Sequence, residues 1–132
     1  MSRLLIVEGE ATIAKDIHDM TAEWGWHVIG LEGDATSGLR RARLKRPDVA
    51  IVGLRLPGEL SGIDVGEALR REMRVPVIYL TGPKDECYSA MARVRQPFAL
   101  IDKPFDAAYL RRVLDRAFRG PGSMSASCSP FD

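Results

Sequence analysis

Charged and hydroxyl side chains in this sequence follow directly after short apolar runs. Glu8 and Glu10 follow the first run, Thr81 follows a later one, and Asp102 and Lys103 follow the last. Ligands of open α/β sheets bind in the crevice outside the carboxyl ends of the strands. If these runs are parallel strands, any functional site is expected where they end.

The first of these ends argues against a nucleotide or flavin site. Neither G-x-x-x-x-G-K-S/T nor G-x-G-x-x-G follows the first apolar run. The segment Glu8-Gly9-Glu10 presents acid where a phosphate cradle needs amide donors and no negative charge. We therefore expect neither nucleotide binding nor enzymatic activity.

Five apolar runs are unbroken rather than alternating, which is typical of strands that are covered on both faces. They are Leu4–Val7, Val28–Leu31, Val49–Val52, Val77–Leu80 and Ala99–Ile101. Segments of helical period lie between them, such as the apolar stripe formed by Ile13, Ile17 and Met20. Alternating strands and helices predict right-handed crossovers and a doubly wound α/β fold with a parallel sheet.

Capping residues mark where several of these helices begin. Asp34 and Asp106 are candidate N-caps, and Ser61 with Asp64 forms a candidate capping box. A further helix is expected near residues 85–94.

The chain of 132 residues suffices for one compact domain, which we place at residues 1–119. Residues 120–132 are rich in small residues and are expected to form a flexible tail or a truncated linker. No apolar run is long enough to span a bilayer and no signal peptide opens the chain, so we expect a cytoplasmic protein.

The net charge of +1 gives no general attraction to nucleic acid. One helix-period segment nevertheless carries a local basic cluster, which we interpret as a solvated helix face. Its members are Arg40, Arg41, Arg43, Lys45 and Arg46.

Five stretches at the predicted strand ends and loops resemble the response-regulator receiver domains of two-component signalling. They are Leu-Leu-Ile-Val-Glu at 4–8, Pro-Asp-Val-Ala-Ile-Val at 47–52, Leu-Pro-Gly-Glu-Leu-Ser-Gly-Ile-Asp at 56–64, Val-Pro-Val-Ile-Tyr-Leu-Thr at 75–81 and Lys-Pro-Phe at 103–105. Each stretch is short, but five in the same order argue against chance similarity. The resemblance implies a receiver-like, flavodoxin-like five-stranded sheet in the order 2-1-3-4-5, flanked by five helices.

Receivers accept a phosphoryl group from a histidine kinase on an aspartate at the end of the third strand. In that family Mg²⁺ is held by an acidic pair after the first strand, and a hydroxyl and a lysine hold the product. The resemblance places a remnant of this phosphorylation pocket here at Glu8, Gly9, Gly53, Thr81 and Lys103.

Three positions depart from the family pattern. Gly53 stands where the phospho-accepting aspartate belongs, and Gly9 replaces one member of the acidic pair. Leu100 stands at the switch position, where many receivers carry a tyrosine or phenylalanine that rotates inward. With one carboxylate left of three, we expect no metal site, no cofactor and weak or absent Mg²⁺ binding.

Two side chains are expected to take structural roles in this remnant. Lys103 is expected to pair with Glu8, and Glu10 is expected to cap the first helix or to place charge at its N-terminus.

The leading interpretation is an atypical single-domain response regulator, a pseudo-receiver that acts by phosphorylation-independent protein–protein interaction. Its partner would be a histidine kinase, another signalling protein or a second copy as a homodimer, and neither nucleic acid nor a membrane. Receivers dock partners through the fourth helix, fifth strand and fifth helix, or kinases near the first helix. Here the first of these faces would carry Tyr88, Met91, Arg95, Asp102, Tyr109, Arg111 and Arg112.

Two alternatives stay open. The chain is a receiver that is still phosphorylated on a non-standard carboxylate such as Glu59 or Asp64. Or it is the receiver fragment of a longer DNA-binding or enzymatic response regulator.

Overall fold

The computed structural model describes residues 2–82, 99–102 and 105–119. Its five strands are β1 (Arg3–Val7), β2 (His27–Glu32), β3 (Val49–Gly53), β4 (Val77–Thr81) and β5 (Ala99–Asp102). Its helices are α1 (Ala11–Glu23), α2 (Ala35–Lys45), α3 (Gly62–Met73) and α5 (Ala107–Arg119). Each predicted strand is confirmed, and each extends one residue beyond the apolar run at one or both ends.

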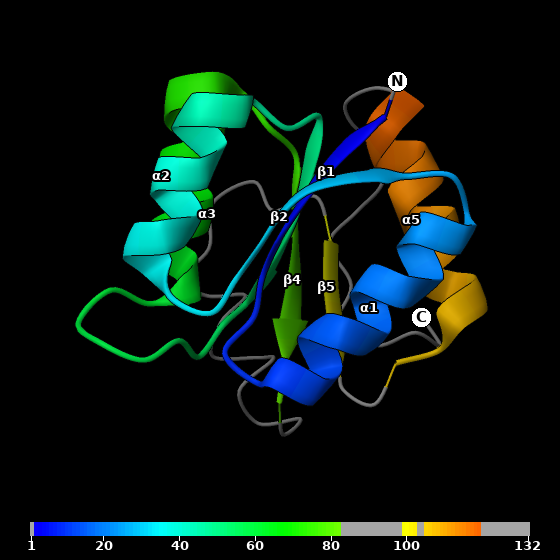
Figure 1. Ribbon diagram of the computed structural model, residues 1–132, viewed down its shortest axis with the longest axis horizontal. Coiled ribbons are helices and arrows are strands. Elements are labelled where there is room, and N and C mark those ends of the chain that lie inside the picture. Colours follow the sequence, from blue (N-terminus) through cyan, green and yellow to red (C-terminus); the bar gives the residue numbers. More distant parts are fainter. Residues whose placement is uncertain (1, 83–98, 103–104, 120–132) are drawn as a thin grey trace.

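The strands form one parallel sheet in the order β2-β1-β3-β4-β5, as the resemblance implies. Consecutive parallel strands need crossover connections, and α1, α2 and α3 supply those that join β1 to β4 along the chain. Figure 1 shows α2 and α3 together on one side of the sheet and α1 and α5 together on the other. The described residues contain four helices; the fifth expected helix, near residues 85–94, lies outside them.

The helix starts predicted from capping residues are confirmed. Asp34 Oδ1 accepts a hydrogen bond from the Ser37 amide at 2.8 Å. Ser61 and Asp64 form a reciprocal capping box. Asp106 directly precedes α5, and its Oδ1 accepts a hydrogen bond from the amide of Ala108 in the first turn at 3.0 Å. Each cap satisfies amide groups that the first helical turn leaves without intrahelical partners.

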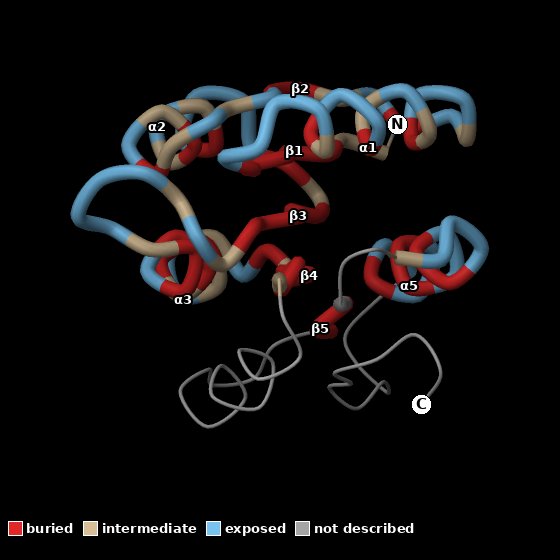
Figure 2. The backbone as a smooth tube through the Cα atoms, turned by 90° about the horizontal axis from the view of Figure 1, so that it is seen from below, coloured by how far each residue is buried: buried red, intermediate tan, exposed pale blue. Residues whose placement is uncertain are grey.

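Successive side chains of every strand point to opposite faces of the sheet, which builds two apolar layers. Leu5, Val7 and Val52 pack beneath α2 and α3. Leu4 and Ile6 pack beneath α1 and α5. Figure 2 shows the buried strands running between the two helical layers. The candidate site thus lies at the carboxyl-terminal edge of a sheet that is covered on both faces.

Among the residues that the structure describes, no helix is both long enough and apolar enough to cross a membrane.

Candidate functional site

The carboxyl ends of β1, β3 and β4 lie side by side because these strands are neighbours in the sheet. Glu8 directly follows β1, Gly53 ends β3 in register with Leu80, and Thr81 ends β4. Both Glu8 and Thr81 are buried. The structure thus brings these three pocket positions together, whereas Lys103 lies outside the described residues and its pairing with Glu8 stays a prediction.

The Glu8 carboxylate lies over the backbone of Gly53. A Cβ atom placed on Gly53 would stand 2.5 Å from Glu8 Oε1 and 3.1 Å from its carboxyl carbon. Only 2% of the Glu8 surface is exposed, and its Oε2 accepts a hydrogen bond from the Glu10 amide at 2.9 Å. A Cβ atom at position 53 would therefore require the Glu8 carboxylate to shift.

The backbone of Gly53 is also approached from the other direction by Gly62, the first residue of α3. The Gly62 amide donates a hydrogen bond to the Leu54 carbonyl at 2.9 Å. A Cβ atom on Gly62 would overlap the Gly53 carbonyl oxygen. Gly62 was not identified from the sequence. The available signal was a glycine directly after the N-cap serine, a position that needs glycine only where another backbone comes close.

Gly9 leaves room for a carboxylate that the sequence does not supply. A Cβ atom there would meet its nearest neighbours, the Arg55 carbonyl oxygen and Pro57 Cδ, at 3.4 Å. Gly9 is exposed and its φ is not positive. Neither the space around it nor its backbone conformation therefore requires glycine. Its effect on the site is the loss of one charge.

Glu10 is the N-cap residue of α1, as predicted, but its side chain makes no capping hydrogen bond to the helix. Of the two roles expected of Glu10, the side-chain cap is wrong, and the position of its charge at the N-terminus of α1 is confirmed. Its amide donates a hydrogen bond to the Glu8 carboxylate. The loop between β1 and α1 thus helps to hold Glu8 over Gly53.

The positions at these strand ends carry few oxygen ligands for a divalent cation. Mg²⁺ and similar hard ions need several oxygen ligands in a regular arrangement. Glu8 supplies a carboxylate, but Gly9 and Gly53 supply none. Over the described ranges, no group of three or more Asp, Glu, His or Cys side chains is placed to hold a metal ion.

The switch position is filled by a buried aliphatic side chain. Leu100 is fully buried and pairs in register with Tyr79 of β4, which is also buried. Both belong to the apolar layer under α3, where the Tyr79 hydroxyl reaches Gly66. Burial raises the pKa of Tyr79 far above its ordinary value, and nearby Glu67 adds to the shift. An aromatic ring is thus held in the core on the strand beside the switch position.

The predicted docking face is described only in part. Tyr88, Met91 and Arg95 lie outside the described residues, and of Asp102 only the backbone, in β5, is described.

On α5 the prediction needs one correction. Tyr109 is only 8% exposed and belongs to the apolar layer beneath α5, because it shares a helix face with Val113 four residues later. Arg111 and Arg112 are exposed, and their guanidinium groups lie 5.5 Å from the Trp24 ring centre and 5.6 Å from that of Tyr109. The α5 face thus offers arginines that already lie over aromatic rings, not a free tyrosine.

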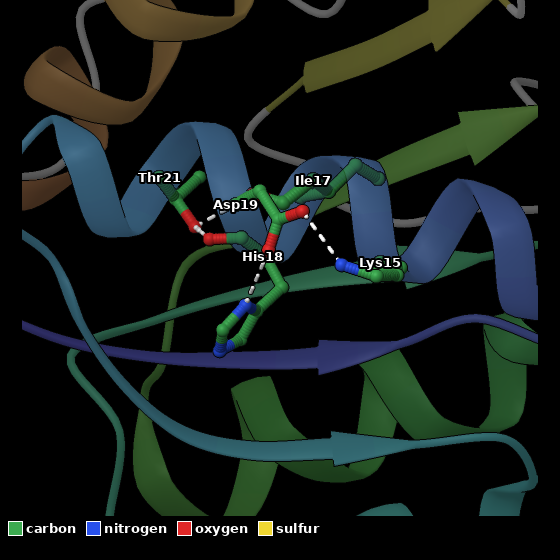
Figure 3. A network of polar contacts seen from close by, with 5 residues as sticks. All are labelled: Lys15, Ile17, His18, Asp19 and Thr21. Carbon is green, nitrogen blue, oxygen red and sulfur yellow. Dashed lines mark hydrogen bonds and ion pairs between the residues drawn. The ribbon is translucent and has the colours of Figure 1, made fainter.

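The first helix carries a local network of polar contacts (Figure 3). Lys15 Nζ and Asp19 Oδ2 are 2.9 Å apart, and His18 Nδ1 lies 3.2 Å from Asp19 Oδ1. The hydrogen bond from Lys15, and then that from His18, lowers the pKa of the Asp19 carboxyl. Thr21 Oγ1 donates to the Ile17 carbonyl at 2.7 Å. The contacts of Asp19 with Lys15 and His18 are exposed and screened by water, whereas the Thr21 hydrogen bond is buried. All of them lie within the helix, so they indicate no further site.

Comparison with known proteins agrees with this geometry. Residues 4–115 match the family model of the response regulator receiver domain. The transcriptional regulatory protein PdtaR of Mycobacterium tuberculosis is 30% identical over 115 residues, which are 87% of this chain and 56% of PdtaR. The phyllosphere-induced regulator PhyR of Methylorubrum extorquens is 30% identical over 117 residues, 88% of this chain and 43% of PhyR.

Among solved structures, the signal receiver domain of a modulated diguanylate cyclase from Desulfovibrio desulfuricans G20 superposes with a TM-score of 0.82 at 29% identity. The match covers 90% of this chain and 94% of that domain. The chain spans about half the length of the two curated relatives described above. Since the family model covers most of the sequence and the sheet order agrees with it, the chain belongs to the response regulator receiver domain family.

Proposed function

We propose that this chain is a pseudo-receiver, which keeps the receiver fold as a module for protein–protein interaction that does not depend on an aspartyl phosphate. The observation that carries the proposal is the position of the Glu8 carboxylate over Gly53. The side chain that would accept phosphate is absent, and the space it would enter is already taken. We propose as its partner a histidine kinase, another signalling protein or a second copy of the chain.

The charges around the pocket support the same proposal. Phosphoryl transfer requires a nucleophile and a cation that neutralises the phosphoryl oxygens. A pocket with Glu8 as the remaining carboxylate of three offers weak attraction for Mg²⁺. We therefore propose that Mg²⁺ binding is weak or absent and that partner binding needs neither the ion nor phosphate.

Intact-mass spectrometry after incubation with acetyl phosphate and Mg²⁺ tests the proposal. The control is the triple variant Glu8→Asp, Gly9→Asp, Gly53→Asp. It shortens residue 8 because a side chain at position 53 would otherwise meet Glu8 Oε1 at 2.5 Å. We expect no added phosphate on the natural chain and a labile phosphate on the control.

A phosphate adduct on the natural chain would overturn the proposal and favour the non-standard acceptor. The variants Glu59→Gln and Asp64→Asn then identify it. Asp64 is the weaker candidate, since its carboxylate already accepts the Ser61 amide at 2.8 Å in the capping box of α3. Glu59 is exposed in the loop before α3.

The relatives extend the proposal to a longer architecture. PdtaR is named a transcriptional regulatory protein and PhyR a phyllosphere-induced regulator, and each is longer than the region that this chain matches. A receiver within a longer regulator would contribute the same phosphate-independent contact. The mass experiment gives the same expected result for either architecture.

A further inference from the structure

The ends of α2 and α3 form a surface that is more basic than either sequence segment alone. We call it the α2–α3 basic surface, made of Arg40, Arg43, Leu44, Arg46, Arg71 and Arg74, all of which are exposed. The two helices lie in contact on the same face of the sheet (Figure 1). Arg43 Nη2 and Glu72 Oε2, 3.3 Å apart, join their exposed sides. From the sequence only the α2 arginines were recognised as a cluster; the fold adds those of α3.

Two of these arginines have a left-handed backbone conformation, which residues with a side chain rarely adopt. Arg46 and Arg74 end α2 and α3 with φ values of 52° and 57°. They are the non-glycine residues with positive φ within the described ranges. Glycine or asparagine is preferred at such left-handed helix ends, and an outlier of this kind is a reason to look for a function. The helix dipole favours basic residues in the last turn but does not require arginine at this strained position.

Leu44 adds an exposed apolar side chain to the surface. Its surface is 72% exposed, the highest value among the large hydrophobic residues that the structure describes as exposed. It lies four residues after Arg40 and next to Arg43, so the three side chains share the outer side of α2. The last seven residues of this helix rise about 10 Å, which places Leu44, Arg40 and Arg43 within reach of one short segment.

We propose that the α2–α3 basic surface binds an acidic segment of a partner protein that carries an apolar side chain for Leu44. This inference rests on the proposed function, because it names the surface and the partner chemistry of the same interaction module. Charge complementarity selects an anionic partner. A protein partner can bury Leu44 against an apolar side chain, whereas a phosphate backbone offers it no apolar contact. This favours a protein over a nucleic acid.

The rest of the molecule favours this assignment over nucleic acid. The net charge is only +1, and Glu72 lies within the surface and neutralises part of it. On the opposite face of the sheet, α1 presents exposed Asp16, Asp19 and Glu23. A polyanion as large as a duplex gains little from so small a basic area. A short acidic peptide contacts this area without meeting the acidic face.

Titration of the isotope-labelled chain with a short peptide of glutamates and leucines, followed by amide NMR, tests the proposal. We expect shifts confined to the last turns of α2 and α3. The double variant Arg40→Glu, Arg71→Glu should weaken binding by about tenfold or more, as should Leu44→Ser by several-fold. The exposed control Lys15→Glu on α1 should bind like the natural chain. These side chains are exposed, and an unchanged urea midpoint checks that each variant is folded.

Three results would overturn the inference. One is equal affinity for a peptide in which serines replace the leucines, because Leu44 would then contribute nothing. Another is tighter binding of a DNA duplex at the same salt concentration, which would assign the surface to nucleic acid. The third is that the chain alone sediments as an oligomer and that the variant Arg40→Glu, Arg71→Glu sediments as a monomer. That result would assign the surface to the acidic α1 of a second copy. None of them changes the phosphate adduct measured by mass spectrometry, so failure here is distinguishable from failure of the proposed function.

Discussion

The relation between Glu8 and Gly53 is the residue-level feature that separates this chain from a phosphorylated receiver. Gly53→Ala adds a Cβ atom 2.5 Å from Glu8 Oε1, so the buried carboxylate must move. We expect the free energy of unfolding to fall by about 1–3 kcal/mol, as for other overpacked interior sites. Urea unfolding of the natural chain and the variant measures the change.

A second substitution isolates the cause. In a Glu8→Ala background the methyl group added by Gly53→Ala meets no carboxylate, so most of the loss in the free energy of unfolding should disappear. The double-mutant cycle should give a coupling energy of about 1–2 kcal/mol. Gly9→Ala is the matched control, because its Cβ atom meets its nearest neighbours only at 3.4 Å. Equal losses with and without Glu8 would show that Gly53 is required for another reason.

The pocket positions are assigned by the resemblance to receiver domains, but their arrangement could not be predicted from the sequence. That resemblance also implies the missing carboxylates at Gly9 and Gly53. That Glu8 turns over Gly53 depends on a side-chain conformation, and that Tyr109 is buried depends on which face of α5 meets the sheet. Such facts are set by packing between elements far apart in sequence, which a local pattern does not contain.

At the scale of elements, the start of α3 is held against the end of β3 by a glycine. Gly62→Ala would place a Cβ atom onto the Gly53 carbonyl oxygen, a backbone atom that cannot rotate away. We expect a loss of about 2–4 kcal/mol in the free energy of unfolding. Gly33→Ala, whose Cβ atom would meet only the Glu8 carbonyl oxygen at 4.0 Å, should change it by less than about 0.5 kcal/mol. Similar values for the two variants would show that α3 can shift along the sheet without cost.

The packing of α3 on β4 predicts a substitution whose effect on stability changes sign with the residue that it faces. Gly66 lies within α3, where alanine is intrinsically preferred by about 1 kcal/mol. The Tyr79 hydroxyl occupies the space of a Cβ atom at this position, so Gly66→Ala should instead destabilise the natural chain. In a Tyr79→Leu background, which removes the hydroxyl and the distal ring atoms, the same substitution should stabilise it. Thermal unfolding of the four proteins measures this reversal, and a destabilising effect in both backgrounds would contradict it.

The strands and three helix starts were predictable because each was encoded locally. Unbroken apolar runs placed the strands, and Asp34, Ser61 and Asp106 marked helix starts. The approach of α3 to β3 was not predictable, because it brings together residues 53 and 62 through a loop whose path no periodicity specifies.

At the scale of the whole molecule, the pocket charge links global stability to divalent cations. Restoring all three carboxylates with Glu8→Asp, Gly9→Asp, Gly53→Asp places like charges at the ends of adjacent strands, so the free energy of unfolding without metal should fall at neutral pH. Mg²⁺ that binds only the folded variant should then raise it, by about 2.7 kcal/mol at a hundredfold excess over the dissociation constant.

The natural chain, with Glu8 alone at these positions, should show no such gain in the same urea titrations. Two natural-chain results would count against the proposed function: stabilisation by Mg²⁺, or changes in the amide spectrum at Thr81 on adding Mg²⁺ with beryllofluoride. A folded triple variant whose free energy of unfolding does not change with Mg²⁺ would instead mean that positions 8, 9 and 53 do not share one site. The measurement therefore tests the alignment with phosphorylated receivers separately from the claim that this chain works without their chemistry.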